Sequence, residues 1–150
     1  MESAPSYRER LVPPWWLLLV LLLIVPASLL VFLPVDIRVG IGVAAVLYLA
    51  IALALWLGAP TLELRNGQLR AGRARIGVDD LGPAEPLEGG AAKTAMRAAW
   101  NPADHHVISP WTTALVRVPV IDPEDATPAW IVSSRRPRAL AAAITAAQSG

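Results

Sequence analysis

The chain has 150 residues, of which 55% are apolar and 17% charged, and its formal net charge is +1 at pH 7. The apolar fraction exceeds what a soluble domain needs, so part of the chain is expected to lie in lipid. The absence of cysteine excludes disulfides and thiolate sites, and the 10 basic and 9 acidic residues beyond position 60 leave no basic stripe for nucleic acid.

Two long uncharged stretches predict a membrane hairpin. Trp15 to Leu33 and Val39 to Leu57 are each long enough, at 1.5 Å per residue in a helix, to cross the roughly 30 Å hydrocarbon core of a bilayer. We therefore expect a cytosolic segment at 1–14, transmembrane helices at 15–33 and 39–57, and an extracytoplasmic connector at 34–38. Because the connector is so short, the two helices must run antiparallel.

Arginines next to these stretches predict their orientation. Arg38 is the only basic residue of the connector, whereas the two outer flanks together carry Arg8, Arg10, Arg65, Arg70, Arg73 and Arg75. Basic flanks stay on the cytosolic side, so both termini are expected in the cytosol, at the plasma (inner) membrane. The alternative is a signal peptide cleaved near Ala27, but apolar residues resume at once at Leu29.

Residues 61–150 predict a small cytosolic α+β domain, an antiparallel β-sheet or partial barrel with a C-terminal helix. Its clearest element is a β-hairpin over 61–72, because Asn66-Gly67 is typical of a type I′ turn. The register that this turn predicts places Leu64 opposite Leu69 and Glu63 opposite Arg70. A third strand is expected from Ala74 after a bulge or turn at Gly72.

A short helix is predicted between Gly89 and Asn101. Its apolar face is expected to pack on the core, with Lys93 and Arg97 on the opposite side. That apolar face comprises Ala92, Met96, Ala99 and Trp100.

Further strands are predicted at 105–109, 114–121 and 130–132, where β-branched residues are frequent. Pro119 suggests that 114–121 is an edge strand, because proline cannot donate to a neighbouring strand. Asp122 to Asp125 has the composition of a turn. The chain then enters a terminal helix through Ser134 to Pro137, and the apolar stripe of that helix is Leu140, Ile144 and Ala147.

Several segments resemble an uncharacterised family. They are Tyr7-Arg8-Glu9-Arg10-Leu11, residues 71–76 with Leu81-Gly82, and residues 116–118, 122–123, 130–133 and 136–137. They resemble an actinobacterial family of small two-pass membrane proteins of unknown function, and the likeness covers nearly the whole chain. More loosely, two spans before strands and a closing helix are similar to bacterial membrane-anchored proteins with a pleckstrin-homology-like domain.

This resemblance implies a topology and not an activity. The chain departs from the family pattern at Asp104-His105-His106 and at Ser109-Pro110-Trp111. Any role that the family gives to an arginine at these places is therefore not carried over to this sequence.

No catalytic constellation is recognisable in the sequence, and no cofactor or metal site is predicted. His105 and His106 would point to opposite faces of a strand, which is poor geometry for chelating one ion. Asp79-Asp80 could hold Mg²⁺ on a lipid diphosphate, but a second acidic motif would be expected, so turn capping explains the pair better. Ser133-Ser134 lacks a glycine-flanked elbow and an obvious base, so helix entry explains it better than nucleophilic catalysis.

The arginines that follow the second span are the remaining candidate site. A basic residue near an anionic leaflet gains about 1 kcal/mol, so Arg65, Arg73 and Arg75 are the candidate membrane-surface contacts. We expect a non-enzymatic, membrane-anchored binding or regulatory module whose partners are anionic lipid headgroups or a cytosolic or membrane protein. The alternatives are an assembly subunit of a larger membrane complex and a lipid-modifying membrane enzyme. The sequence leaves the oligomeric state open.

Overall fold

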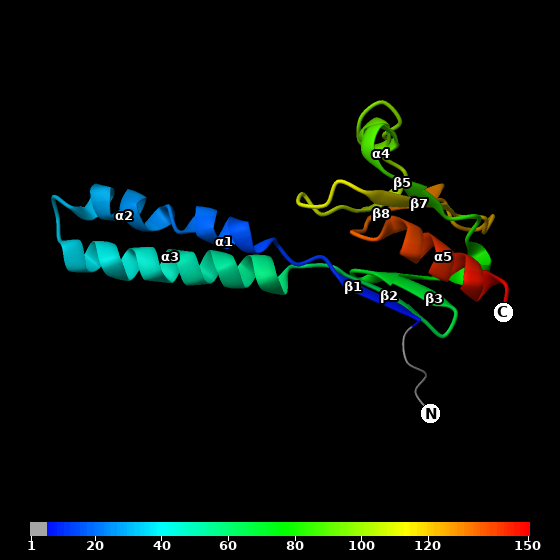
Figure 1. The fold of residues 1–150 in the computed structure, drawn as a ribbon, viewed down its shortest axis with the longest axis horizontal. Coiled ribbons are helices and arrows are strands. Elements are labelled where there is room, and N and C mark those ends of the chain that lie inside the picture. The colour runs from blue at the N-terminus through cyan, green and yellow to red at the C-terminus, as the bar shows by residue number, and fades with distance from the viewer. Residues whose placement is uncertain (1–5) are drawn as a thin grey trace. The chain divides into compact units, whose positions relative to one another are not determined.

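A computed structural model describes residues 6–150, which fall into two compact units (Figure 1). One unit is formed by the chain up to Leu11 together with Pro60–Gly150, and the other by Val12–Ala59. The helical hairpin is therefore an insertion within one folded domain, and the domain has a part on each side of it in the sequence.

The first apolar stretch is helical in two pieces, α1 (Trp15–Leu21) and α2 (Ile24–Phe32). Pro26 has no N–H to donate to the carbonyl oxygen of Leu22, and that oxygen instead accepts from the nitrogen of Val25 at 3.0 Å. The tighter bonding around Leu22 and Leu23 interrupts the helix that was expected to be continuous.

The second helix, α3 (Ile37–Leu57), begins two residues before the predicted Val39. The side chain of Asp36 caps it by accepting from the backbone nitrogen of Arg38 at 2.8 Å, so Arg38 belongs to the first helical turn. Gly40 lets α2 approach closely, because a Cβ there would lie 3.2 Å from that of Phe32. Residues 15–32 and α3 are both long and apolar enough to cross a membrane.

Sheet 1 contains four antiparallel strands in the order β1-β2-β3-β4. The predicted hairpin is confirmed: Asn66 and Gly67 have φ values of 51° and 70°, as a type I′ turn requires, and Leu64 lies opposite Leu69. A turn at Gly72, where φ is 63°, leads into β4. The strands are β1 (Tyr7–Arg10), β2 (Thr61–Arg65), β3 (Gln68–Ala71) and β4 (Ala74–Gly77).

The strand β1 was not foreseen, because residues 1–14 were expected to be only a flank of the hairpin. Its alternation places Tyr7 and Glu9 on the buried side and Arg8 and Arg10 on the exposed side. Just beyond the pair of β1 and β2, the backbone nitrogen of Leu11 donates to the carbonyl oxygen of Pro60 at 3.0 Å. The two chain segments that enter and leave the hairpin are thus hydrogen-bonded neighbours.

Sheet 2 has the strand order β5-β7-β8-β6, in which only the pair of β6 and β8 is parallel. The expected α+β architecture is confirmed, but with two sheets in place of one. Pro119 does not mark an edge strand, because β7 is flanked on both sides. It is the last residue of β7, beyond the part that β5 pairs with. These strands are β5 (Glu85–Leu87), β6 (His105–Val107), β7 (Leu115–Pro119) and β8 (Ala129–Ser133).

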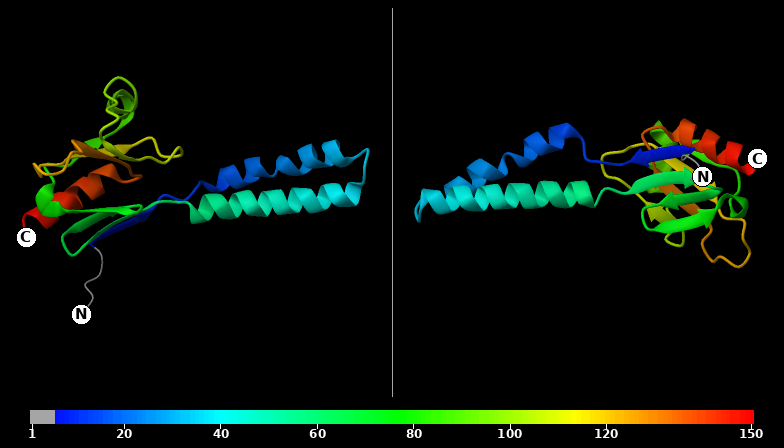
Figure 2. Two further views of the ribbon diagram at one scale, coloured as in Figure 1. Left: turned by 180° about the vertical axis from the view of Figure 1, so that it is seen from behind. Right: turned by 90° about the horizontal axis from the view of Figure 1, so that it is seen from below.

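The terminal helix α5 (Pro137–Gln148) lies between the two sheets (Figures 1 and 2). Its predicted stripe is confirmed, since Leu140 and Ile144 are fully buried and Ala147 packs against the same core. Leu64 and Leu69 of sheet 1 and Val116, Val118 and Val132 of sheet 2 belong to this core. One hydrophobic core therefore holds both sheets and the helix together.

The helix α4 (Gly89–Met96) was expected to lie with its whole apolar face on the core, and this is only partly right. Ala92 is buried beside Leu87 and Ile131 on the other face of sheet 2. In contrast, 37% of Met96 and 44% of Trp100 are exposed. The helix ends at Met96, so Ala99 and Trp100 are not on its face at all.

The contribution of β1 can be tested by comparing two truncated proteins. In one, residues 12–59 are replaced by a two-residue Asn-Gly turn, which suits the close approach of Leu11 to Pro60. The other is the fragment 60–150, which lacks β1. We expect cooperative urea unfolding, followed by circular dichroism, only for the hairpin-replaced protein, because the fragment exposes the edge of β2 and loses Leu11 from the core. Equal stability of the two proteins would show that β1 is dispensable.

Candidate functional site

The outward side of sheet 1 carries a cluster of arginines. In the register of the four strands, Arg8, Glu63, Arg70 and Arg75 lie opposite one another in a single row. Side chains that are directly opposite in a sheet share one face. We define the arginine face as the outward-facing side chains Arg8, Arg10, Arg65, Arg70 and Arg75.

The arginine face contains a juxtaposition of like charges. Arg70 and Arg75 are direct cross-strand partners and both are exposed. The sequence pairs Arg70 with Glu63, and the register agrees, but no ion pair joins these two described residues. The Nε of Arg70 donates to the carbonyl oxygen of Gly72 at 3.2 Å. Within the strands of sheet 1, Glu63 is the only outward carboxylate.

The three predicted membrane contacts occupy different places on sheet 1. Arg75 is in the central row, and Arg73 is exposed on the turn between β3 and β4. That turn is at the end of the sheet from which the chain enters the hairpin, since Gly72 donates to the carbonyl oxygen of Thr61 at 3.0 Å. Arg65 is half-buried at the opposite end, beside the Asn66 turn. The structure thus places Arg75 in the central row of sheet 1, with Arg65 and Arg73 toward opposite ends of the sheet.

Sequence reasoning missed three members of the arginine face. Arg8 and Arg10 were interpreted only as topology signals, and Arg70 was set aside as the partner of Glu63. The alternation in Tyr7-Arg8-Glu9-Arg10-Leu11 was the available signal. A glutamate at the central buried position disguised it, because an inward residue of a strand is normally apolar.

That glutamate forms the second polar cluster of the domain. Glu9 is 7% exposed, and one of its oxygens, Oε2, accepts from the hydroxyls of Tyr7 and Ser134, each at 2.6 Å. Its Oε1 accepts from the backbone nitrogen of Arg135 at 2.8 Å. A buried carboxylate needs such donors to offset its loss of hydration. The carboxylate therefore joins β1 to the chain that enters α5.

The tyrosine of this cluster is held in its neutral form. Burial raises the pKa of Tyr7 above its usual value of 10.0, and the hydrogen bond to Glu9 raises this pKa further. The Arg136 guanidinium, 5.3 Å from the centre of the Tyr7 ring, acts in the opposite direction. A neutral hydroxyl keeps its proton, so Tyr7 remains a donor to the carboxylate.

A serine hydroxyl bonded to a carboxylate resembles an activated nucleophile with its base. Ser134, however, is 0% exposed, and its Oγ also accepts from the backbone nitrogen of Arg136 at 3.1 Å. No substrate atom can approach it in this arrangement. Ser133 is equally buried and accepts from the backbone nitrogen of Ser109 at 2.9 Å. Ser134 therefore holds the backbone at the entry to α5, as the helix-entry interpretation predicts, whereas Ser133 ends β8 and holds the segment at Ser109.

The histidines and the Asp79-Asp80 pair are separate features. His105 packs against Trp130 with ring centres 4.6 Å apart, whereas His106 stacks on Trp100 at 3.7 Å. Asp79 and Asp80 are exposed in a single 3₁₀ turn. Among residues 6–150, no three histidine, aspartate or glutamate side chains gather in a way that could hold a metal ion.

The tie formed by Glu9 can be tested with Ser134→Ala in the hairpin-replaced protein. The substitution removes one donor to the carboxylate and the acceptor of Arg136, so we expect the free energy of unfolding to fall by about 1–3 kcal/mol. Ser149→Ala, at an exposed serine of α5's end, is the matched control and should change it by less than about 0.5 kcal/mol. Urea titration measures both. If Ser134→Ala left the free energy of unfolding unchanged, the cluster would not tie β1 to α5.

Comparisons with known proteins agree with the extent of this fold. No curated protein and no solved structure matches the chain. A protein-family model described as "Protein of unknown function (DUF3093)" matches residues 6–144. This range begins one residue before β1 and ends within α5, so it includes the hairpin and both sheets. The chain belongs to the DUF3093 family.

Proposed function

We propose that this protein is a two-pass protein of the plasma membrane, with both termini in the cytosol, and that it acts as a membrane-anchored binding module. In this proposal the arginine face of its cytosolic domain binds anionic lipid headgroups of the inner leaflet. The opposed pair of Arg70 and Arg75 is the observation that carries the proposal.

The pairing of β1 with β2 supports the topology. The two strands precede and follow the hairpin, yet they are joined along four residue pairs, from Tyr7 opposite Leu64 to Arg10 opposite Thr61. Strands that pair must lie on the same side of the membrane, so the chain between them crosses it an even number of times. The basic flanks of the hairpin favour the cytosolic side.

The charge arrangement supports lipid binding. Like charges directly opposite in a sheet destabilise it, and Arg70 and Arg75 are held in this relation with a third arginine, Arg8, in the same row. Anionic headgroups would offset the repulsion, because each arginine gains about 1 kcal/mol near an anionic surface. A guanidinium also binds phosphate in a bidentate manner, which suits phospholipids.

The other functional classes find less support. An enzyme needs an accessible reactive group, and the serine and carboxylate that come together are buried. The likeness to pleckstrin-homology-like domains remains a prediction: a C-terminal helix packed against two sheets favours it, while the parallel pair of β6 and β8 departs from the antiparallel sheet that it implies.

The orientation can be tested with reporters in bacterial cells. A fluorescent protein fused after Gly150 should fluoresce, and alkaline phosphatase at the same place should be inactive, because that enzyme folds only outside the cytosol. The reverse pattern is expected when either reporter is inserted after Val35, in the connector. An active phosphatase after Gly150 would overturn the orientation and, with it, binding to the inner leaflet.

Lipid binding can be tested in the full-length protein in nanodiscs. Because the chain has no cysteine, a single Gln68→Cys, exposed on the outward side of β3, accepts a polarity-sensitive fluorophore. Its emission should shift to the blue when zwitterionic lipid is exchanged for anionic lipid. Arg70→Glu with Arg75→Glu should abolish the shift, and 1 M salt should reduce it, because the screening length is then about 3 Å.

Two controls make this measurement specific. Arg117→Glu with Arg138→Glu makes the same change of charge on sheet 2 and α5, and should leave the shift intact. A fluorophore on Ala126→Cys, in an exposed loop, should not respond to the lipid. An equal loss of the shift in both double variants would mean that overall charge, and not the arginine face, causes it.

A further inference from the structure

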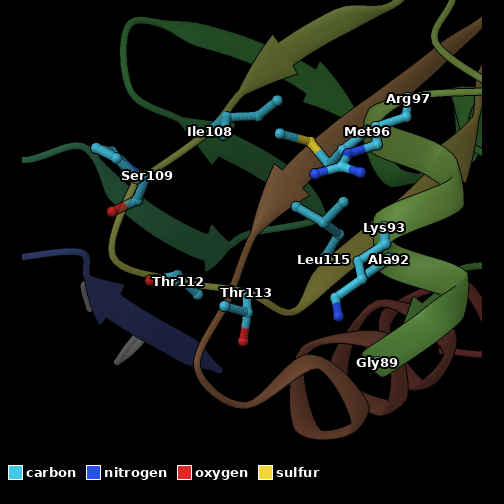
Figure 3. Close-up of a pocket in the computed structure, with 11 residues that line it drawn as sticks. Gly89, Ala92, Lys93, Met96, Arg97, Ile108, Ser109, Thr112, Thr113 and Leu115 are labelled. Atoms are coloured by element: carbon cyan, nitrogen blue, oxygen red, sulfur yellow. The ribbon is translucent and has the colours of Figure 1, made fainter.

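A groove separates α4 from the segment that leads from β6 to β7 (Figure 3). Its volume is about 530 Å³, within the range of about 300–1,000 Å³ that is typical of small-molecule sites. It lies on the α4 side of sheet 2, where Leu115 also contacts the small cluster around Ala92. It is therefore distinct from the arginine face, which belongs to sheet 1.

The interior of the groove is apolar. The helix presents one continuous face to it, since Ala92 and Met96 are four residues apart and so lie one above the other. Ile108 and Leu115 contribute from the facing segment and from β7. Figure 3 shows the side chains of Met96 and Ile108 directed toward one another across the groove. This is the face of α4 that was expected to be covered by the core.

Two cations border this apolar interior. Lys93 of α4 and Arg97, the residue that follows α4, line the groove and are both exposed. Among the described residues, neither side chain makes an ion pair or a side-chain hydrogen bond. Met96 lines the same groove. Positive charge without a protein partner, next to apolar surface, is complementary to a ligand that has an anionic head and an apolar chain.

We propose that this groove binds a single-chain anionic amphiphile, an acyl chain that ends in a carboxylate or a phosphate. The chain would lie along Ala92, Met96 and Ile108, and the head would bind Lys93 and Arg97. A carboxylate or phosphate accepts charge-assisted hydrogen bonds from both cations. The hydroxyls of Ser109 and Thr112 are directed away from α4 in Figure 3, so recognition rests on the two cations and the apolar wall.

The test uses the full-length protein in zwitterionic nanodiscs and two photoactivatable probes. One is a long-chain fatty acid with a diazirine in its chain, and the other is the fatty alcohol of the same length and diazirine position. After irradiation, mass spectrometry maps the labelled peptides. We expect the acid to label the segments 89–97 and 108–115, and the alcohol to label them about tenfold less. That difference corresponds to about 1.4 kcal/mol.

Two variants probe the head and the chain separately. Lys93→Glu with Arg97→Glu should reduce labelling by the acid about tenfold without reducing labelling by the alcohol. Met96→Trp, which fills the groove, should reduce labelling by both probes. Arg117→Glu with Arg138→Glu is the control for charge and should leave labelling unchanged. An unaltered thermal unfolding midpoint would show that each variant remains folded.

Three results would overturn the proposal. Equal labelling by acid and alcohol would mean that the groove does not select an anionic head. Labelling of the groove segments that neither variant reduces would mean that the probe binds elsewhere. Absence of labelling there would leave the groove to an occupant of another kind, such as a peptide. Because Arg70→Glu with Arg75→Glu should not change labelling of the groove, a failure here is distinguishable from a failure of lipid binding by the arginine face.

Discussion

The pairing of β1 with β2 is the constraint on which the rest of the structure depends. It closes one sheet from two segments that the helical hairpin separates in the sequence, and it supplies two of the five outward arginines. On its inner side, the same strand places a buried carboxylate against the start of α5. Without β1, sheet 1 would lose its edge strand and the backbone of β2 would be exposed. The hydrogen bonds of Glu9 to the start of the terminal helix would be lost as well. The hairpin is therefore an insertion within the domain and not a segment attached to one of its ends.

Local patterns could be predicted from the sequence, whereas long-range relations could not. The Asn66-Gly67 turn determined the register of β2 and β3, and the stripe of α5 gave its buried face. The strand that pairs with β1 lies beyond the hairpin in the sequence, and the central inward residue of β1 itself is Glu9. Neither a nearby partner nor a regular alternation of apolar and polar residues therefore indicated that β1 is a strand. The apolar face of α4 was predicted correctly as a pattern. What covers that face was not predicted, because the periodicity of apolar residues in a helix shows which side is apolar and not what packs against it.

The candidate site shows the same division. The sequence identified arginines near the second span as a candidate surface, but proximity along the chain is a poor guide to a shared face. Arg65 and Arg70 are on one strand hairpin yet in different rows of their sheet, whereas Arg8, far away in the sequence, is in the same row as Arg70 across two strand pairs. Only the register reveals that like charges are opposed. A groove between a short helix and an irregular segment has no periodic signature, so it could not have been predicted.

The pairing of the first strand with the second also orders the events of synthesis. The ribosome makes β1 before both helices, and β2 after them, so the sheet cannot close until the whole hairpin has emerged. Non-local pairing of this kind is slow to form. Until β1 pairs with it, β2 has an open edge, of the kind that invites aggregation. The position of the hairpin in the sequence therefore delays completion of the domain until both helices have been made.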